Sequence, residues 1–371
     1  MNRARFRFLP LVGNEFIKPM QRISTFVMFG IVVLVGFLGI LVSSLTQTTG
    51  ATDSNGSPLT DRQILTDRIQ QEQQAIQRQQ SNLASLLDKG VYESIVGNDR
   101  LQPTLAPDEL KTAIAETRFV ISSSGQYLSI DQYRLDRGLP QSEDSTALGY
   151  AASQGWIVQL LTVFAVVLAA VGVASEFTGG TIRLLLTRPF RRWKILLSKY
   201  IGVYLIALCL LFLSVGIALL GGVMLRGFTS SPYLTFVNGA VHATPMIWIV
   251  LLRFALASVE LLLISTMAFM IASVFRTSGL SIGLSLFLMF IGGTVTSAMA
   301  NLGKSYDIPI LQTLAKFSMF AYTDLSPYIL RRDMASTVPE GSLLFAVTVL
   351  VFYYFAFVSI AFLGFSKRDV A

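Results

Sequence analysis

The amino-acid sequence predicts an all-α polytopic membrane protein with six transmembrane helices. Its 371 residues are 53% hydrophobic and 14% charged, whereas a soluble chain of this length carries about 25% charged residues. The apolar residues are gathered in runs long enough to cross a bilayer, which takes about 20 residues. The predicted spans are residues 23–45, 156–174, 195–225, 246–275, 279–300 and 342–365.

Lysine and arginine residues predict the orientation of these spans, because cytoplasmic loops of membrane proteins carry an excess of both. The amino-terminal segment 1–22, the insert 175–194 and the tail after residue 365 all contain several basic residues. They fall on one side when both termini are cytoplasmic, so we expect a multi-pass protein of the cell membrane with that orientation. Because the basic residues flank apolar spans, the net charge of +7 indicates orientation in a membrane and no nucleic-acid partner.

Segment 1–22 is expected to form a cytoplasmic amphipathic helix at the membrane interface. Its apolar residues are interleaved with charged ones: Leu11, Phe16, Ile17 and Met20 with Glu15, Lys18 and Arg22. The run 23–45 that follows is too long for the core of a signal peptide, and no small-residue cleavage site comes after it. We therefore expect it to be retained as the first transmembrane helix.

Residues 46–155 are expected to form an extracytoplasmic domain of mostly helical structure. They contain 9 Lys/Arg and 14 Asp/Glu, a net charge of −5, while the rest of the chain carries +12. The single cysteine, Cys209, lies inside an apolar run, so no internal disulfide can stabilise this domain. Its carboxylates are scattered, which favours a structural or recognition role over catalysis.

Residues 60–89 predict the first helix of this domain. Ile69, Ile76 and Leu83 recur every seven residues and give one narrow apolar stripe, which is typical of a coiled-coil arm. A second helix is expected to start at Pro107, because proline is favoured at the first helical position, and to end near Arg118.

Two short strands are predicted after that second helix. Residues 119–121 and 127–130 are rich in β-branched, aromatic and other apolar side chains, and Gly125 lies between them. These residue types favour strands, and a glycine between two such runs is typical of a turn.

The sequence contains no nucleotide-binding or metal-binding motif. Residues 303–305 read Gly-Lys-Ser, like the end of a phosphate-binding loop, but Ala298 stands where the loop requires glycine. The chain has one histidine, His242, and no cluster of metal-ligating side chains. We therefore expect no metal, no bound cofactor and no enzymatic activity of the chain itself.

Two ionisable residues in the fourth span, Arg253 and Glu260, are candidates for a transport path. Their spacing of seven residues places both on one helix face, about two turns apart. A charge inside the membrane is costly and is therefore unlikely to face lipid. Either they line a substrate or ion path, or they are structural, with Glu260 hydrogen-bonded to a neighbouring helix and Arg253 extended toward the outer interface.

The insert between the second and third spans carries the most informative motif. An acidic residue, Gly-Thr, Leu-Leu, proline, arginine and lysine follow one another in this order: Glu176, Gly180-Thr181, Leu184-Leu185, Pro189, Arg191 or Arg192, and Lys199. This order resembles the permeases of type-2 ATP-binding-cassette (ABC) transporters. The amino-terminal interface helix, the six spans and an amphipathic stretch at 309–317 fit the same plan. An acid near a helix start and a proline stop also favour a short helix here.

The resemblance implies that the segment 176–192 is a coupling helix that docks onto a separate ATPase subunit, with transmembrane helices two to six in residues 156–371. ATP and Mg²⁺ would be bound by that ATPase. The implied partners are two ABC ATPase subunits, a second copy of the permease or a homologous permease, and membrane lipids. The residues implied in coupling are Glu176, Thr181, Arg183, Leu185, Arg188, Pro189, Arg191 and Arg192.

The expected function is that of a permease subunit that exports a small molecule, peptide, lipid or ion. The chain departs from the compact polysaccharide exporters of this class, which usually lack the insert 46–155, and this places a glycan substrate in doubt. Two other functions stay open. One is a membrane sensor or scaffold whose external helices bind a ligand or envelope partner, and the other is a secondary transporter that uses Glu260 as a proton or cation site.

Overall fold

The computed structural model describes residues 8–47, 60–89, 94–96, 99–101, 107–178, 192–275, 277–330 and 342–366. The chain divides into two compact units. The membrane unit contains residues 1–42, 150–225 and 249–371, and the insert unit contains residues 43–149 and 226–248.

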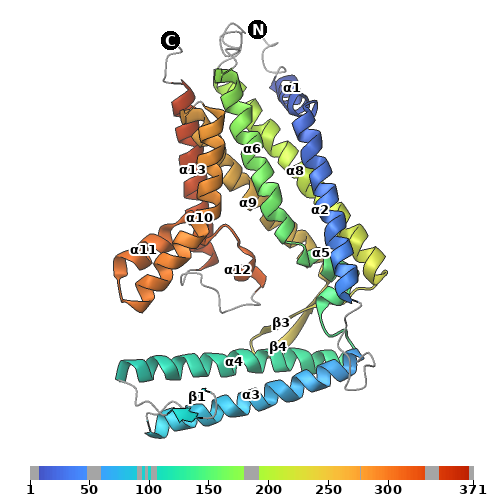
Figure 1. Cartoon of the computed structure of the whole chain (residues 1–371), viewed down its shortest axis with the longest axis vertical. Coiled ribbons are helices and arrows are strands. Elements are labelled where there is room, and N and C mark those ends of the chain that lie inside the picture. The colour runs from blue at the N-terminus through green and yellow to red at the C-terminus, as the bar shows by residue number, and fades with distance from the viewer. Residues whose placement is uncertain are drawn as a thin grey trace. The chain divides into compact units, whose positions relative to one another are not determined.

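Six helices in the described part of the chain are long and apolar enough to cross a membrane. They are α2 (Ile23–Gln47), α6 (Trp156–Thr178), α8 (Arg192–Arg226), α9 (Met246–Phe275), α10 (Ser278–Ser305) and α13 (Leu343–Ser366). Each predicted span falls on one of them, which confirms the all-α polytopic membrane protein (Figure 1). Helices α8 and α9 have 35 and 30 residues, so they must tilt or project beyond a hydrocarbon layer that about 20 residues can cross.

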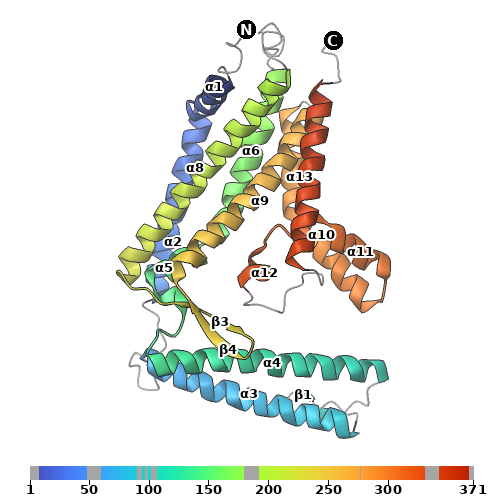
Figure 2. The ribbon, with the colours of Figure 1, turned by 180° about the vertical axis from the view of Figure 1, so that it is seen from behind.

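Helix α1 (Phe8–Met20) is the amphipathic helix expected in segment 1–22. Its residues Leu11, Val12 and Glu15 are buried, while Ile17 and Lys18 are exposed. Helix α1 and the last turn of α13 lie at the same end of the membrane unit, as six spans require (Figures 1 and 2). We call this end the α1 end.

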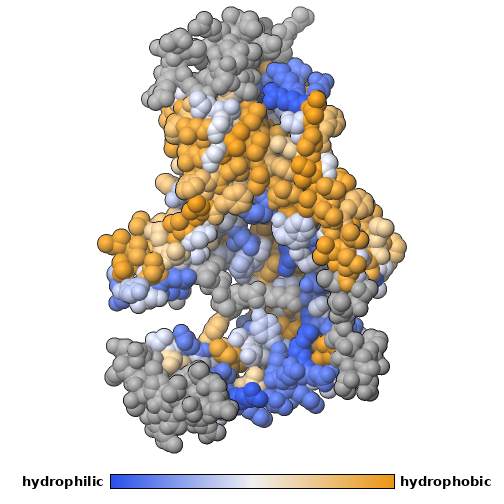
Figure 3. Space-filling model, in the orientation of Figure 1, coloured by the Kyte–Doolittle hydropathy of each residue, from blue (hydrophilic) through white to orange (hydrophobic). Residues whose placement is uncertain are grey.

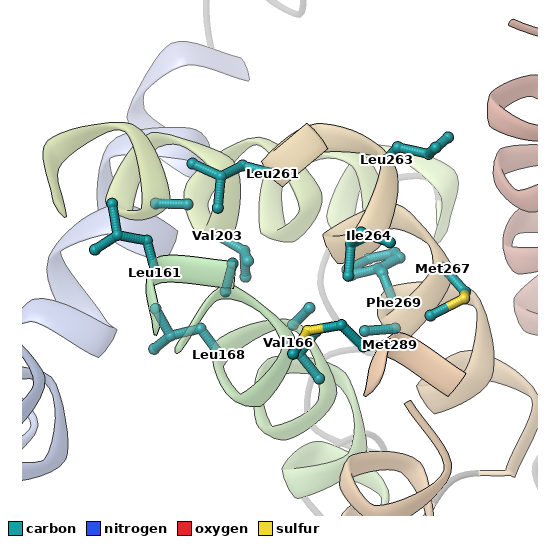
Figure 4. Packing of buried hydrophobic residues seen from close by; sticks show 14 of the residues in the cluster. Leu161, Val166, Leu168, Val203, Leu261, Leu263, Ile264, Met267, Phe269 and Met289 are labelled. Carbon is teal, nitrogen blue, oxygen red and sulfur yellow. The ribbon is translucent and has the colours of Figure 1, made fainter. Parts of the chain in front are cut away.

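The core of the membrane unit is centred on α6. In its most apolar window, 61% of the residues are buried, against 17% in α13. Figure 4 shows the α6 side chains Leu161 and Val166 packed among residues of three other helices, including Val203 of α8, Phe269 of α9 and Met289 of α10. Helix α6 is therefore the central helix around which the other spans are arranged.

The outer faces of the spanning helices are apolar. Figure 3 shows a broad apolar surface over the membrane unit. The three tryptophans of the chain, Trp156, Trp193 and Trp248, are exposed within the first turn of α6, α8 and α9. Tryptophan is enriched where a membrane meets water, so these residues indicate where the hydrocarbon layer begins and ends.

Helix α11 (Pro309–Phe317) folds back along the end of α10. The Gln312 amide donates a hydrogen bond of 2.7 Å to the Gly303 carbonyl oxygen, and the hydroxyls of Thr296 and Ser318 are 2.8 Å apart. Thr296 lies about 14 Å before the end of α10 at a rise of 1.5 Å per residue, so the chain returns that far along it. The apolar face predicted for this helix is exposed: Ile310, Leu314 and Phe317.

Shorter elements complete the chain. Two 3₁₀ turns, η1 (Glu143–Ser145) and η2 (Met319–Ala321), precede the short helices α5 (Ala147–Ser153) and α12 (Ser326–Leu330). Strands β1 (Ser94–Val96) and β2 (Asp99–Leu101) pair antiparallel in the insert unit.

The insert unit is built on two long helices, α3 (Asp61–Lys89) and α4 (Pro107–Arg137), which pack along each other (Figure 1). Leu65, Ile69 and Leu86 of α3 are buried. Of the predicted stripe, Ile69 is buried and Ile76 and Leu83 are half-buried. The stripe is therefore confirmed in part, and its partner is α4 of the same chain.

The strands predicted at 119–121 and 127–130 are wrong, as is the predicted helix end near Arg118. Helix α4 runs without a break through both segments to Arg137. Its face at Thr117 and Asp131 is buried. Local preferences for strand are a weak prior, and packing along α3 overrides them.

A β-hairpin follows α8 where only a loop was expected. Strands β3 (Tyr233–Val237) and β4 (Ala240–Thr244) pair antiparallel through the turn Asn238-Gly239. Both turn residues have positive φ, 52° and 82°, as the favoured two-residue hairpin turn requires. The Asn-Gly pair between runs of β-forming residues was the sequence signal for this hairpin.

A buried ion cluster ties α3, α4 and the chain before η1 together. The Arg134 guanidinium contacts Glu143 at 2.5 Å and Asp131 at 3.3 Å, and it donates to the Gln141 carbonyl oxygen at 2.7 Å. Arg68 of α3 contacts the other oxygen of Asp131 at 3.4 Å. Arg134, Asp131 and Glu143 are each at most 5% exposed, so this cluster is shielded from water.

Glu72 beside this cluster supports a prediction of pH dependence. Burial raises its pKa above the ordinary 4.5, the charge of Asp131 raises it further, and Arg68 opposes both. Because its pKa is raised, protonated Glu72 contributes to the free energy of unfolding below pH 4.5. This contribution is lost as the pH rises through the pKa of Glu72 in the folded state. Glu72→Gln should therefore raise the melting temperature of the insert unit at pH 7–8, and its advantage should shrink as the pH falls toward 4.5.

The measurement is thermal unfolding or hydrogen exchange of α3 and α4 in the full chain at several pH values. Glu116→Gln, at an exposed position of α4, is the matched control and should show no such pH-dependent gain. A Glu72→Gln variant that is less stable than the parent at pH 8 would contradict this prediction.

Candidate functional site

The predicted coupling helix lies between α6 and α8. Helix α6 continues to Thr178, so the backbone of Glu176 belongs to the last turn of the second span. Helix α8 begins at Arg192. The predicted range 176–192 therefore overlaps α6 at residues 176–178 and α8 at residue 192. Residues 179–180 are glycines, which favour a helix end, and they follow α6 directly. What remains is the segment 179–191, which lies outside the described residues.

Most of the predicted coupling residues fall in that segment, and their roles stay predictions. They are Thr181, Arg183, Leu185, Arg188, Pro189 and Arg191. The described chain resumes in the first turn of α8, where the Lys194 ammonium lies 5.6 Å from the centre of the Trp193 ring. This cation–π contact places a basic residue beside an aromatic one at the α1 end of the membrane unit.

A buried ion pair joins α1 to α8 two turns after the segment 179–191. The Lys199 ammonium lies 2.8 Å from one carboxylate oxygen of Glu15, and Lys18 lies 3.4 Å from the other. Glu15 is 7% exposed and Lys199 is 9% exposed. The backbones also approach closely, because a Cβ atom at Gly202 would lie 3.0 Å from the Glu15 carbonyl oxygen.

Sequence patterns place Glu15 on an amphipathic helix and Lys199 in the motif of the insert, without pairing the two residues. The two residues are 184 positions apart, and no local pattern links positions so distant. One signal was available. Glu15 lies four residues after Leu11, on the apolar face of α1, where an acid needs a partner.

The pKa of Glu15 follows from these contacts. Burial alone would raise it, but the positive charges of Lys199 and Lys18 outweigh burial and hold the pKa below its ordinary value. With a lowered pKa, the stability that Glu15 contributes is present above pH 4.5 and is lost as the pH falls through the folded-state value. The Glu15 carboxylate is therefore ionised at neutral pH.

Hydroxyl groups of Tyr200, beside Lys199, and of Tyr204, about one turn further along, link α8 to α9 and α13. The hydroxyls of Tyr200 and Thr266 are 2.7 Å apart, and Tyr200 donates to the Tyr354 hydroxyl at 3.5 Å. Tyr204 donates to the Ser258 carbonyl oxygen at 3.3 Å. Hydrogen bonds between helices hold a membrane bundle together where apolar packing competes with lipid, so α8 is fixed to both neighbours.

Arg253 contacts the end of α5. Its guanidinium donates a hydrogen bond of 2.6 Å to the Ala152 carbonyl oxygen. Carbonyl groups in the last turn of a helix lack partners within the helix, and a cationic side chain is favoured there. This contact supports the structural alternative for Arg253.

Glu260 lies near a second carboxylate. Asp324, between η2 and α12, is close enough to interact electrostatically with Glu260. The Asp324 carboxylate itself accepts a hydrogen bond of 2.8 Å from the Ser326 backbone amide. The structure thus brings Glu260 toward Asp324, while Arg253 on the same helix is engaged with α5.

In the described ranges, no three His, Cys, Asp or Glu side chains come together in an arrangement that could hold a metal ion. The polar groups described above are ion pairs, interhelical hydroxyl contacts and one pair of carboxyl groups. The ion pairs and hydroxyl contacts hold neighbouring helices together, and the carboxyl groups of Glu260 and Asp324 are ionisable groups of the membrane unit.

Comparison with known families decides where the chain belongs. Residues 112–371, well over half of the chain, match a family described as "Protein of unknown function (DUF2705)". The chain belongs to the DUF2705 family. The DUF2705 match begins within α4 and extends over α6 to α13. It includes Lys199, Arg253 and Glu260, while α1 and Glu15 precede it.

Two relatives of this DUF2705 chain come from Bacillus subtilis (strain 168). The "Uncharacterized protein YhcI" is 33% identical over 267 residues, which cover 71% of this chain and 82% of the relative. The "Uncharacterized membrane protein YdbK" is 24% identical over 228 residues, which cover 61% of this chain and 85% of the relative. The second name agrees with the six spanning helices.

Proposed function

We propose that this DUF2705 chain is the membrane-spanning permease subunit of an ATP-driven ABC exporter. The observation that carries the proposal is the junction at the α1 end of the membrane unit. There an amphipathic helix is fixed by a buried ion pair to the base of α8, directly after the segment 179–191. A force received by that segment would pass into α8 and α1 together.

The wider arrangement supports the same function. The amphipathic helix α1, the six spans and the α10–α11 hairpin before the last span resemble the plan of type-2 permeases. In this proposal the α1 end is cytoplasmic, because Lys18, Arg22, Arg192 and Lys194 lie in or beside α1 and in the first turn of α8. Both termini are then cytoplasmic, and the insert unit follows a span that ends outside the cell membrane.

Energy for transport would come from a separate ATPase subunit that binds ATP and Mg²⁺, because the chain carries no phosphate-binding loop of its own. The segment 179–191 would dock on that subunit, with its arginines against acidic groups or lipid phosphates. Two such permeases would complete the transporter. The exported substrate would be a small molecule, peptide, lipid or ion.

The test is co-expression of the tagged chain with the products of its neighbouring reading frames, among which we expect an ABC ATPase. We expect the ATPase to co-purify with the tagged chain in equal amount, from detergent or lipid nanodiscs. A chain that elutes as one sharp species without any ATPase would contradict the proposal.

One observation favours a second candidate, a secondary transporter driven by a proton or cation gradient. Glu260 and Asp324 lie near each other in the membrane unit, and ionisable residues inside membrane proteins mark proton and ion paths. Transport in vesicles that contain the chain, a gradient and no ATPase would support this candidate over the exporter.

A further inference from the structure

The Glu15–Lys199 ion pair occupies a position where an apolar contact would be the simpler way to stabilise the fold. Both partners are almost completely buried, and the atoms that meet are 2.8 Å apart. Removing two charges from water is expensive, and replacing a buried pair by apolar side chains of similar size is often neutral or stabilising. Stability alone therefore gives no reason for this pair.

The location of the pair suggests a reason. Helix α1 meets α8 at Lys199 and Gly202, within three turns of the start of α8. At a membrane surface, lipid can cover apolar side chains as well as protein can. Apolar packing therefore gives little preference for the docked position of α1 over an undocked one. An ion pair in a medium of low dielectric does give that preference, because each charge loses its partner when the helices separate.

The surrounding contacts fit a rigid connection. Leu11 and Val12 are buried on the same face of α1 as Glu15. The backbone of α1 meets α8 at Gly202, one turn beyond Lys199. A Cβ atom at Gly202 would lie only 3.0 Å from the Glu15 carbonyl oxygen. Lys199 itself lies seven residues after Arg192, the first residue of α8, which is a rise of about 10 Å along the helix.

We propose that Glu15 and Lys199 are positioning residues that make α1 and α8 move as one body, so that a displacement at the start of α8 is transmitted to the amphipathic helix at the membrane surface. This inference rests on the proposed exporter function. Glu15 holds the carboxylate, Lys199 holds the ammonium, and the close approach at Gly202 fixes their register. Without the pair, α8 moves while α1 stays behind in the lipid interface.

Four variants separate this role from simple packing. Glu15→Gln and Lys199→Met each remove one charge. The double variant Glu15→Lys/Lys199→Glu exchanges the charges, and the double variant Glu15→Leu/Lys199→Met replaces the pair by apolar side chains. The exchanged pair should restore the connection, whereas the apolar pair should keep the fold and lose the connection.

The first measurement needs no ATPase. Spin labels are attached at Ile17→Cys on α1 and Leu205→Cys on α8, both exposed positions, in a Cys209→Ser background in nanodiscs. The distance distribution between the labels should be narrow in the parent and in the charge-exchanged variant. It should broaden in the two single variants and in the apolar variant. One narrow distribution shared by all five proteins would overturn the proposal.

The second measurement is ATP hydrolysis by the complex with the neighbouring ATPase. Complexes with the single variants or the apolar pair should hydrolyse ATP about tenfold more slowly, or slower still, a factor within the usual range of coupling energies. The ATPase should still co-purify with each of them. The charge-exchanged variant should recover most of it. An apolar variant as active as the parent would overturn the proposal. A parent chain that retrieves no ATPase would instead count against the exporter function, and the label distances would still decide whether the pair holds α1.

Discussion

The variant Arg134→Ala is expected to destabilise the insert unit by about 3–5 kcal/mol, the cost of removing one partner from a buried ion pair. Arg134 joins Asp131, Glu143 and the Gln141 carbonyl oxygen, and all three charged side chains are almost fully buried. Its removal takes this partner from two carboxylates in a low-dielectric environment, while Arg68 still contacts Asp131. No disulfide compensates, because the chain has a single cysteine.

Hydrogen exchange of the full chain in nanodiscs measures this effect. The amides of α4 should exchange about 100-fold faster or more, since every 1.4 kcal/mol is a factor of ten, while α6 and α9 should keep their protection. Arg118→Ala is the matched control, because Arg118 is exposed on the same helix and exposed substitutions change stability by about 0.5 kcal/mol or less. Equal protection of α4 in the parent and in Arg134→Ala would show that the ion cluster does not hold the unit together.

The largest functional effect is expected from the segment between α6 and α8. Arg191→Ala should reduce the amount of ATPase that co-purifies by about tenfold or more, because arginine residues that meet a partner often dominate the binding energy. Glu176→Ala should weaken the complex as well, since Glu176 in the last turn of α6 precedes the segment directly. Both variants should insert in the membrane normally, because both residues lie outside the candidate spans Trp156–Ala174 and Trp193–Arg226.

Quantitative pull-down from nanodiscs is the measurement, with Arg226→Ala as the control. Arg226 ends α8 at its opposite end from Arg192 and should leave the complex intact. Unchanged ATPase recovery in both Arg191→Ala and Glu176→Ala would remove the coupling role from this segment.

The spanning helices could be predicted from the sequence because each depends on a local property, a run of apolar residues longer than the bilayer requires. Helix α1 and the helix at Pro309 were predictable for a similar reason, since their apolar residues repeat with the period of a helix. The hairpin with the turn Asn238-Gly239 carries a local signal too, because an Asn-Gly pair between runs of β-forming residues favours a two-residue turn.

Contacts between distant segments could not be predicted in this way. The strands expected near Gly125 are helical because α3 supplies a partner for the whole length of α4. The pairs Glu15–Lys199 and Arg134–Glu143 likewise depend on how separate helices pack. Glu260 could be identified as unusual from its position in an apolar run, but its neighbour Asp324 could not.

The central claim is that this chain receives its energy from a partner ATPase, and ATP hydrolysis by the purified complex tests it most directly. The complex is isolated through a tag on this chain and reconstituted in nanodiscs. A second preparation contains an ATPase whose catalytic carboxylate is replaced by an amide. We predict hydrolysis that elutes with the chain, disappears in the second preparation and falls with Arg191→Ala. A folded chain that elutes alone and shows no ATP hydrolysis would contradict the claim.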